Sequence, residues 1–260
     1  MNFRFSVDDN IWFFQDLAKN NYSSIFENSY LALYKRLHEK YNIKVQLNLF
    51  YQFEDFNLSQ MPDRYKQEWI ANKDWLQLSF HSKTEQTLYT NSSYDELYND
   101  CLAVNNNIIR FAGKEVLNPF TTVHCCKTTD GGNKALHDLG VKGLAGLFGN
   151  KQNPRDSYNL KYENYKNIYD DCYYYDKKYD MFFVNLDMVI NTFKLEDIIP
   201  YLSNLIGKEH IEIMIHEQYF YPHYYMYQPD YEKKIETAVS YLISHNYTSC
   251  FLNEIKMSEL

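Results

Sequence analysis

The sequence predicts one α/β domain in which seven or eight parallel strands and their connecting helices close into a regular or distorted (β/α) barrel. Three observations predict this class. Strand-like and helix-like segments alternate along the chain, polar residues stand at the ends of several strands, and 260 residues suit a single barrel domain. An open, doubly wound sheet is the alternative. Neither GxGxxG nor GxxxxGKS occurs, so no dinucleotide site or P-loop is indicated.

The expected strands are short runs of β-forming or alternating residues. They cover residues 3–7, 44–51, 75–81, 120–125, 143–148, 181–186, 211–216 and 249–252. The expected helices lie between these runs, and capping boxes begin two of them. They cover residues 24–41, 62–71, 93–111, 135–139, 195–205 and 229–245. Residues 150–180 are polar and rich in Tyr, and we expect them to form an insertion within one domain spanning residues 1–260.

Composition narrows the classes of function. The net charge is −8 without any basic run, which argues against nucleic-acid binding. No apolar stretch approaches the ~20 residues of a membrane-spanning helix, and no signal peptide is apparent. The five Cys are odd in number and lack a CxxC pair, so we expect reduced thiols and a cytoplasmic location. The 26 Tyr fit either genome composition or sugar stacking, and the oligomeric state stays open.

Candidate functional residues stand at strand ends. Asp8 and Asp9 end the first strand, His81 the third, His124 the fourth and His216 the penultimate one. Because the C-terminal ends of parallel barrel strands face one mouth, we expect these side chains to meet there. Each residue alone has an ordinary alternative, such as an exposed turn for the two Asp or a hydrogen-bonded rim position for a His.

A metal ion would account for the adjacent carboxylates, since one could bind it while the other acts as a base toward a polarised water. His81 and Glu85 have i, i+4 spacing, so a helical turn there would direct both side chains to one ion. A shell of Asp9, His81, Glu85 and His124 suits zinc, with iron, cobalt or nickel as alternatives.

Several of these segments resemble polysaccharide deacetylases of carbohydrate esterase family 4. The matching segments are FSVDDN on the first strand, FHS after the third and a late IMIH. The resemblance implies a distorted barrel, a divalent metal, and removal of acetyl groups from a carbohydrate or acetylated small molecule. It implies Asp8 as the base, Asp9 and His81 as metal ligands, and His216 as the acid. In two places the sequence departs from the family pattern: Asn10 replaces Gly, and Glu85 replaces a second ligand His.

Substrate contacts are expected from Trp12 and Tyr219, whose rings could stack on sugars, and from Glu217 beside the expected acid. Two other functions compete with deacetylation. A metal-independent glycosidase would use Asp9 and Glu217, two acids about 5–9 Å apart. A non-catalytic relative would bind carbohydrate without turnover.

Overall fold

The structure is a computed structural model and describes residues 1–257. Two sheets form its centre. The larger runs in the order β10-β11-β1-β2-β5 with β12 beside β1, and the smaller in the order β6-β7-β9-β8. The strands of the larger sheet are β1 (Asn2–Asn10), β2 (Val45–Phe50), β5 (Leu76–Ser82), β10 (Met188–Val189), β11 (His210–His216) and β12 (Thr248–Ser249). Those of the smaller are β6 (Phe120–Thr121), β7 (Gly143–Gly146), β8 (Tyr173–Asp176) and β9 (Met181–Asn185), and β3 (Gln52–Phe53) pairs with β4 (Phe56–Asn57).

The two sheets meet at both edges. On one side, a parallel bridge joins Leu78 of β5 to Leu117, just before β6. On the other, Leu186 N donates to Gly146 O of β7 at 2.8 Å, and Asp187 N donates to Glu212 O of β11 at 3.0 Å. The short segment between β9 and β10 therefore connects to strands of both sheets. The predicted (β/α) barrel is confirmed in a distorted form.

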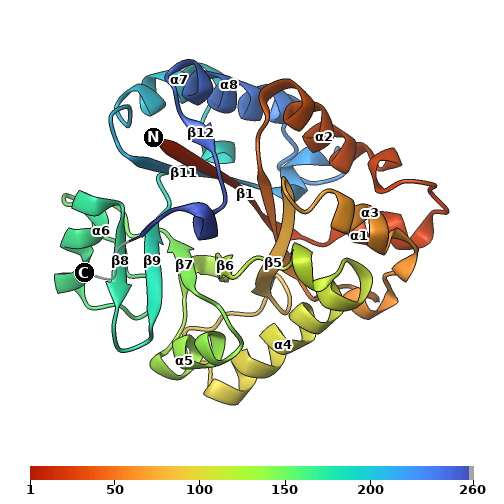
Figure 1. The fold of residues 1–260 in the computed structure, drawn as a ribbon, viewed down its shortest axis with the longest axis horizontal. Helices are drawn as coiled ribbons and strands as arrows, with labels where there is room; N and C mark the ends of the chain where they lie inside the picture. The colour runs from red at the N-terminus through yellow and green to blue at the C-terminus, as the bar shows by residue number, and fades with distance from the viewer. Residues whose placement is uncertain (258–260) are drawn as a thin grey trace.

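Helices surround this centre (Figure 1). They are α1 (Trp12–Lys19), α2 (Ser29–Tyr41), α3 (Lys66–Ala71), α4 (Tyr94–Phe111), α5 (Asp130–Asp138), α6 (Tyr165–Asp171), α7 (Leu195–Ser203) and α8 (Tyr231–Ser244). None of those within residues 1–257 combines the length and apolar character required to cross a bilayer. Alternate residues of β1 face opposite ways: Phe5 packs on Tyr34 of α2, whereas Arg4 bonds with residues of neighbouring strands.

The barrel interior is unusually polar. Arg4 and Glu212 form a fully buried ion pair at 2.6 Å, and Arg4 Nε also donates to Gln46 at 3.0 Å. Gln46 donates to the Asn48 side chain at 2.9 Å, and Asn48 donates to Asp8 at 2.6 Å. A buried charge is tolerated when it is paired and hydrogen-bonded. These bonds run from the bottom of β1 to its C-terminal end and fix the position of Asp8.

Most expected elements are present, with three differences. The expected strand over 120–125 ends at Thr121, because a 3-10 turn follows at His124–Cys126. Residues 150–180 contain α6 and the antiparallel strand β8, which pairs with β9. Helix α1, which begins directly after β1, was not among the predicted elements.

Candidate metal centre

Three side chains converge at the mouth of the barrel. Asp9, His81 and His124 each offer a ligand atom, and these atoms all lie within 4.8 Å of one another. His81 Nε2 lies 2.9 Å from Asp9 Oδ1, yet this buried oxygen accepts no well-aligned hydrogen bond. Two imidazoles and one carboxylate are a donor set that zinc and similar divalent ions prefer. The residues present therefore fit a metal ion.

The backbone of β1 is shaped to present Asp9. The register between β1 and β2 shifts between Val7 and Asn10, and Asp9 adopts a left-handed φ of 65°. Asn10 holds this irregularity, since its amide donates to Val7 O at 2.6 Å and to Asn48 O at 3.0 Å. The Tyr30 hydroxyl donates to Asn10 Oδ1 at 2.7 Å. Asn10, which replaces the Gly of the family pattern, thus has a structural role here.

Hydrogen bonds to the backbone orient both imidazoles. His81 Nδ1 donates to Thr122 O, which leaves Nε2 facing Asp9. His124 Nδ1 donates to Thr87 O at 3.2 Å, and its Nε2 lies 3.7 Å from the Cys125 thiol, a weak contact that a metal ion could replace. Ligand histidines in metalloproteins typically donate their second ring nitrogen to a carbonyl or carboxylate in this way.

The charges at this site favour a cation. Burial alone would raise the pKa of Asp9, but the close approach of the His81 imidazole and the nearby charges of His216 and His124 outweigh burial and hold that pKa well below its usual range. Burial would lower the pKa of His81, but the charges of Asp8 and Asp9 raise it overall. The carboxylates and the imidazoles therefore stabilise one another's charged forms, and a metal cation would take the place of the imidazole proton beside Asp9.

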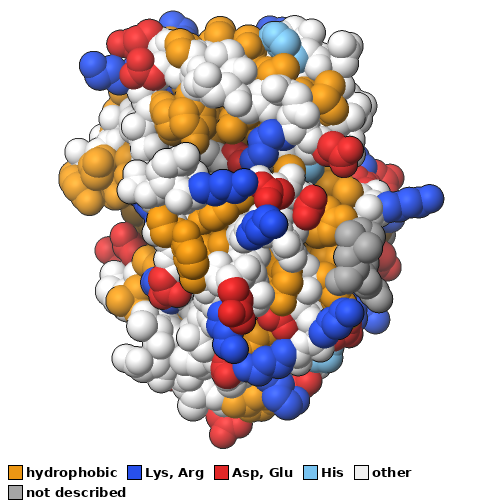
Figure 2. All heavy atoms as spheres, turned by 90° about the vertical axis from the view of Figure 1, so that its left-hand side faces the viewer, with side chains coloured by type: hydrophobic (Ala, Val, Ile, Leu, Met, Phe, Trp, Pro, Cys, Tyr) orange, Lys and Arg blue, Asp and Glu red, His pale blue; other side chains and the backbone are white. Residues whose placement is uncertain are grey.

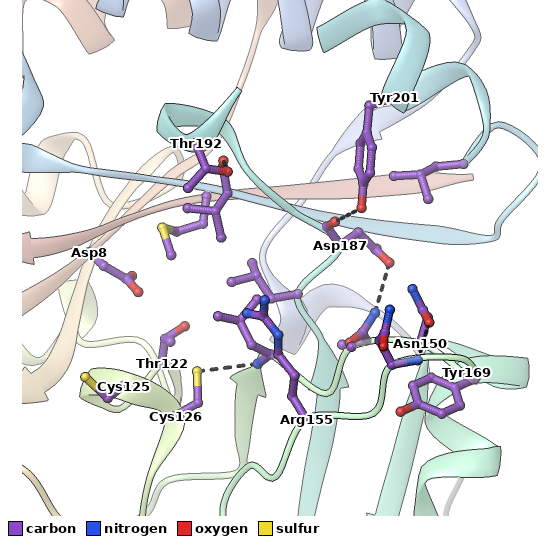
Figure 3. Close-up of a pocket in the computed structure, with 18 of the residues that line it drawn as sticks. Asp8, Thr122, Cys125, Cys126, Asn150, Arg155, Tyr169, Asp187, Thr192 and Tyr201 are labelled. Atoms are coloured by element: carbon purple, nitrogen blue, oxygen red, sulfur yellow. Dashed lines mark hydrogen bonds between the residues drawn. The ribbon is translucent and has the colours of Figure 1, made fainter. Parts of the chain in front are cut away.

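A cavity of about 950 Å³ opens beside these residues, and Asp8 and His216 line it together with His81 and His124. Asp8 is buried and its Oδ1 accepts the Asn48 hydrogen bond, so Oδ2 is its second acceptor. His216 ends β11, and its Nδ1 donates to Asn191 Oδ1 at 2.9 Å. Figure 3 shows Asp8 directed into this cavity beside Thr122 and Cys125.

The other expected site residues lie elsewhere. Glu85 is exposed in a turn after β5 and is outside the group formed by Asp9, His81 and His124, because no helical turn follows the strand. Trp12 packs among aromatic neighbours, with its ring 4.8 Å from that of His223, and lines a separate cavity. Tyr219 is half-buried, with its ring 6.1 Å from the ring of His216.

Glu217 lies beneath the site and is fully buried. Its carboxyl group accepts hydrogen bonds from the backbone N–H groups of Ile11, Trp12 and Phe13 at 2.6–3.0 Å, and from the Tyr221 hydroxyl at 3.0 Å. It therefore anchors the start of α1 and does not face the cavity, which corrects its expected role as a substrate contact. The glycosidase hypothesis loses its second acid for the same reason.

Three residues that hold the site were missed from the sequence: Asn48, Asn191 and Gln218. Gln218 Nε2 donates to Asp9 Oδ2 at 3.2 Å. The polar residues at alternate positions of β2, Gln46 and Asn48, were the available signal, since buried polar side chains on a strand need partners. Asn191 belongs to a short 3-10 turn and had no such signal.

Comparison with known proteins supports the fold. No family model and no curated protein matches the sequence. Among solved structures, a family 4 acetyl xylan esterase from Clostridium thermocellum, in complex with cobalt, matches at a TM-score of 0.53 and 14% identity over 98% of this chain and 89% of that chain. A carbohydrate esterase family 4 pseudoenzyme from Bacillus anthracis matches at 0.50 and 12%, over 97% and 64%.

A 4-α-glucanotransferase from Thermococcus litoralis matches at a TM-score of 0.61 and 13% identity, but this chain covers only 40% of it. At such identities the likeness establishes the fold. The chain has the barrel fold seen in the family 4 polysaccharide deacetylases, and the resemblance noted in its sequence is confirmed at the level of the fold.

Proposed function

We propose that the protein is a metal-dependent hydrolase that removes acetyl groups from a carbohydrate or an acetylated small molecule. The observation that carries the proposal is the convergence of Asp9, His81 and His124 beside a cavity lined by Asp8 and His216. A set of metal ligands, a nearby carboxylate and a separate imidazole together supply what is needed to hydrolyse an acyl bond with a poor leaving group.

Asp9, His81 and His124 would hold the ion, with zinc the best fit and iron, cobalt or nickel as alternatives. When bound, the ion supplies a Lewis acid that polarises the acyl carbonyl and the attacking water. Gln218 keeps Asp9 oriented, and Thr122 and Thr87 keep the two imidazoles oriented. These contacts hold the metal-binding atoms in position even without a bound ion.

Asp8 and His216 would move the protons. Asp8 accepts a proton from the attacking water at Oδ2, because Asn48 occupies Oδ1. His216 gives a proton from Nε2 to the departing amine or alcohol, because Asn191 holds the proton of Nδ1. Asn191 and Asn48 are neutral, so they orient the two catalytic groups without adding charge.

Acetate release from acetylated sugars tests the proposal. Purified protein loaded with zinc should release acetate, and chelation should abolish that release. Asp8→Asn and His216→Ala should each lower kcat by about 10²–10⁴-fold, the usual contribution of a general base or acid. The matched control is His137→Gln, at a surface His paired with Asp138 outside the cavity.

Two results would contradict the deacetylase. Release of reducing ends that survives chelation would identify a glycosidase. Carbohydrate binding with no acetate release, under any of the four metals, would identify a non-catalytic relative of the kind that the Bacillus anthracis pseudoenzyme represents.

A further inference from the structure

The cavity extends well beyond the residues proposed to act on the acetyl group. From Asp8 and His216 it continues between segment 147–155 and the region of α7, where Asp187, Tyr201 and Lys208 line it (Figure 3). At about 950 Å³ it is at the upper end of the ~300–1,000 Å³ typical of ligand pockets. The far half therefore has room for a part of the substrate that carries no reacting atom.

One wall of this far half is a short hairpin with a defined shape. Gly149 and Pro154 pair across it, and Arg155 N donates to Phe148 O at 2.8 Å. Gly149 has a φ of +76°, and a Cβ there would lie 2.1 Å from Asn153 O, so this position requires glycine. The hairpin therefore presents Arg155 from a fixed backbone.

Most cations near the cavity already have acidic partners. Lys208 pairs with Asp187 at 2.5 Å, and Lys151 pairs with Asp170. On the outer face over α6 and β8, basic and acidic side chains likewise neighbour one another (Figure 2). The acids near the site are also engaged, since Asp8 accepts from Asn48 and Asp187 accepts from Glu212 N.

Arg155 is the exception. It is exposed to solvent at the cavity, and among residues 1–257 its guanidinium makes no hydrogen bond or ion pair. The other four arginines all do: Arg4 with Glu212, Arg36 with Glu232, Arg64 with backbone carbonyls and Arg110 with Asp63. Figure 3 shows the Arg155 side chain rising into the cavity between Cys126 and Asp187. A planar guanidinium without a partner suits bidentate binding of a carboxylate or phosphate.

We propose that Arg155 binds an anionic group of the substrate, so that the protein acts on acidic or phosphorylated sugars in preference to neutral ones. The identity of the ligand as an acetylated sugar rests on the proposed function, but anion binding at Arg155 does not require turnover. A carboxylate and a phosphate present similar paired oxygens, and the experiment separates them.

Calorimetric titration tests this in phosphate-free buffer. The probes are N-acetylglucosamine, N-acetylglucosamine 1-phosphate and an N-acetylated aminouronic acid. At least one anionic probe should bind about 10–100-fold more tightly than the neutral sugar, the preference of one charge-assisted bidentate contact. Arg155→Ala should remove this preference and leave neutral-sugar binding unchanged, and Arg155→Lys should retain part of it.

Arg36→Ala is the matched control, because Arg36 is an exposed arginine on α2 outside the cavity. Asp8→Asn should keep the anionic preference while losing acetate release, which separates this inference from the deacetylase proposal. Equal binding of neutral and anionic probes by the wild type, or an anionic preference that survives Arg155→Ala, would overturn it.

Discussion

The contact between Glu217 and the start of α1 allows a quantitative prediction. Glu217 follows the proposed acid on β11, and its side chain bonds to a helix about 200 positions earlier in the chain. Glu217→Ala would leave the backbone N–H groups of Ile11, Trp12 and Phe13, and the Tyr221 hydroxyl, without their acceptor. Because α1 directly follows the strand that carries Asp8 and Asp9, both stability and site geometry depend on this contact.

The expected loss of stability follows from the number of hydrogen-bond donors left without an acceptor. Each buried donor left without a partner costs about 1–3 kcal/mol. Ile11 and Phe13 are fully buried, and water entering the space of the lost side chain could satisfy the less buried Trp12. Two or three unsatisfied donors give a loss of about 2–9 kcal/mol in the free energy of unfolding.

Urea unfolding at pH 7, followed by circular dichroism, measures this loss as a lower midpoint. In a chain of this size, thermal unfolding should shift by about 2–4 °C per kcal/mol. The matched control is Glu39→Ala, which removes an exposed glutamate that pairs with Lys35 and should change stability by less than about 0.5 kcal/mol. A loss below about 1 kcal/mol in Glu217→Ala would refute the view that Glu217 anchors α1.

Three further predictions concern buried groups. Burial raises the pKa of Glu217 from 4.5 to about 7. Between these two pH values the folded protein holds a proton on Glu217 that the unfolded chain has lost, so the free energy of unfolding should fall as the pH rises through this interval. Glu217→Gln should make the free energy of unfolding less dependent on pH there. Cys125 is the one exposed cysteine of five, and burial raises the pKa of Cys126 to about 11, so native protein at pH 8 should react with one equivalent of a thiol reagent and denatured protein with five. Arg4→Ala should cost about 3–5 kcal/mol in urea unfolding, because it leaves the buried Glu212 with only its contact to His210 and leaves a space where the buried Arg4 side chain stood; a cost near zero would contradict the buried ion pair.

The barrel could be predicted because its signals are local. Alternating residues mark β2, and Ser93 caps α4 by accepting from Glu96 N, as the capping pattern indicated. Helix α1 lacked such a signal, since its first N–H groups are satisfied by Glu217 from the far end of the chain. The strand β8 forms a hairpin with β9 through the turn between Asp176 and Met181, and its bounds could not be predicted because the Tyr-rich segment that contains it has no clear periodicity.

The residues of the candidate site also divide into those that a local sequence pattern predicts and those that it does not. Strand ends placed Asp8, Asp9, His81, His124 and His216 at one mouth, because parallel strands share a direction. The i, i+4 argument for Glu85 failed, since it assumed a helical turn where the chain instead folds back beside Tyr51, whose N–H donates to Lys83 O. Partners such as Asn191 depend on contacts that no local pattern encodes.

Metal stoichiometry tests the central claim most directly. Zinc should be titrated into metal-free wild-type protein, His81→Ala and the control His137→Gln, with elemental analysis of each after desalting. The wild type and the control should each hold one equivalent of zinc, and His81→Ala should hold much less, because Asp9, His81 and His124 supply the ligand atoms. No bound metal in the wild type, or full occupancy in His81→Ala, would contradict the account.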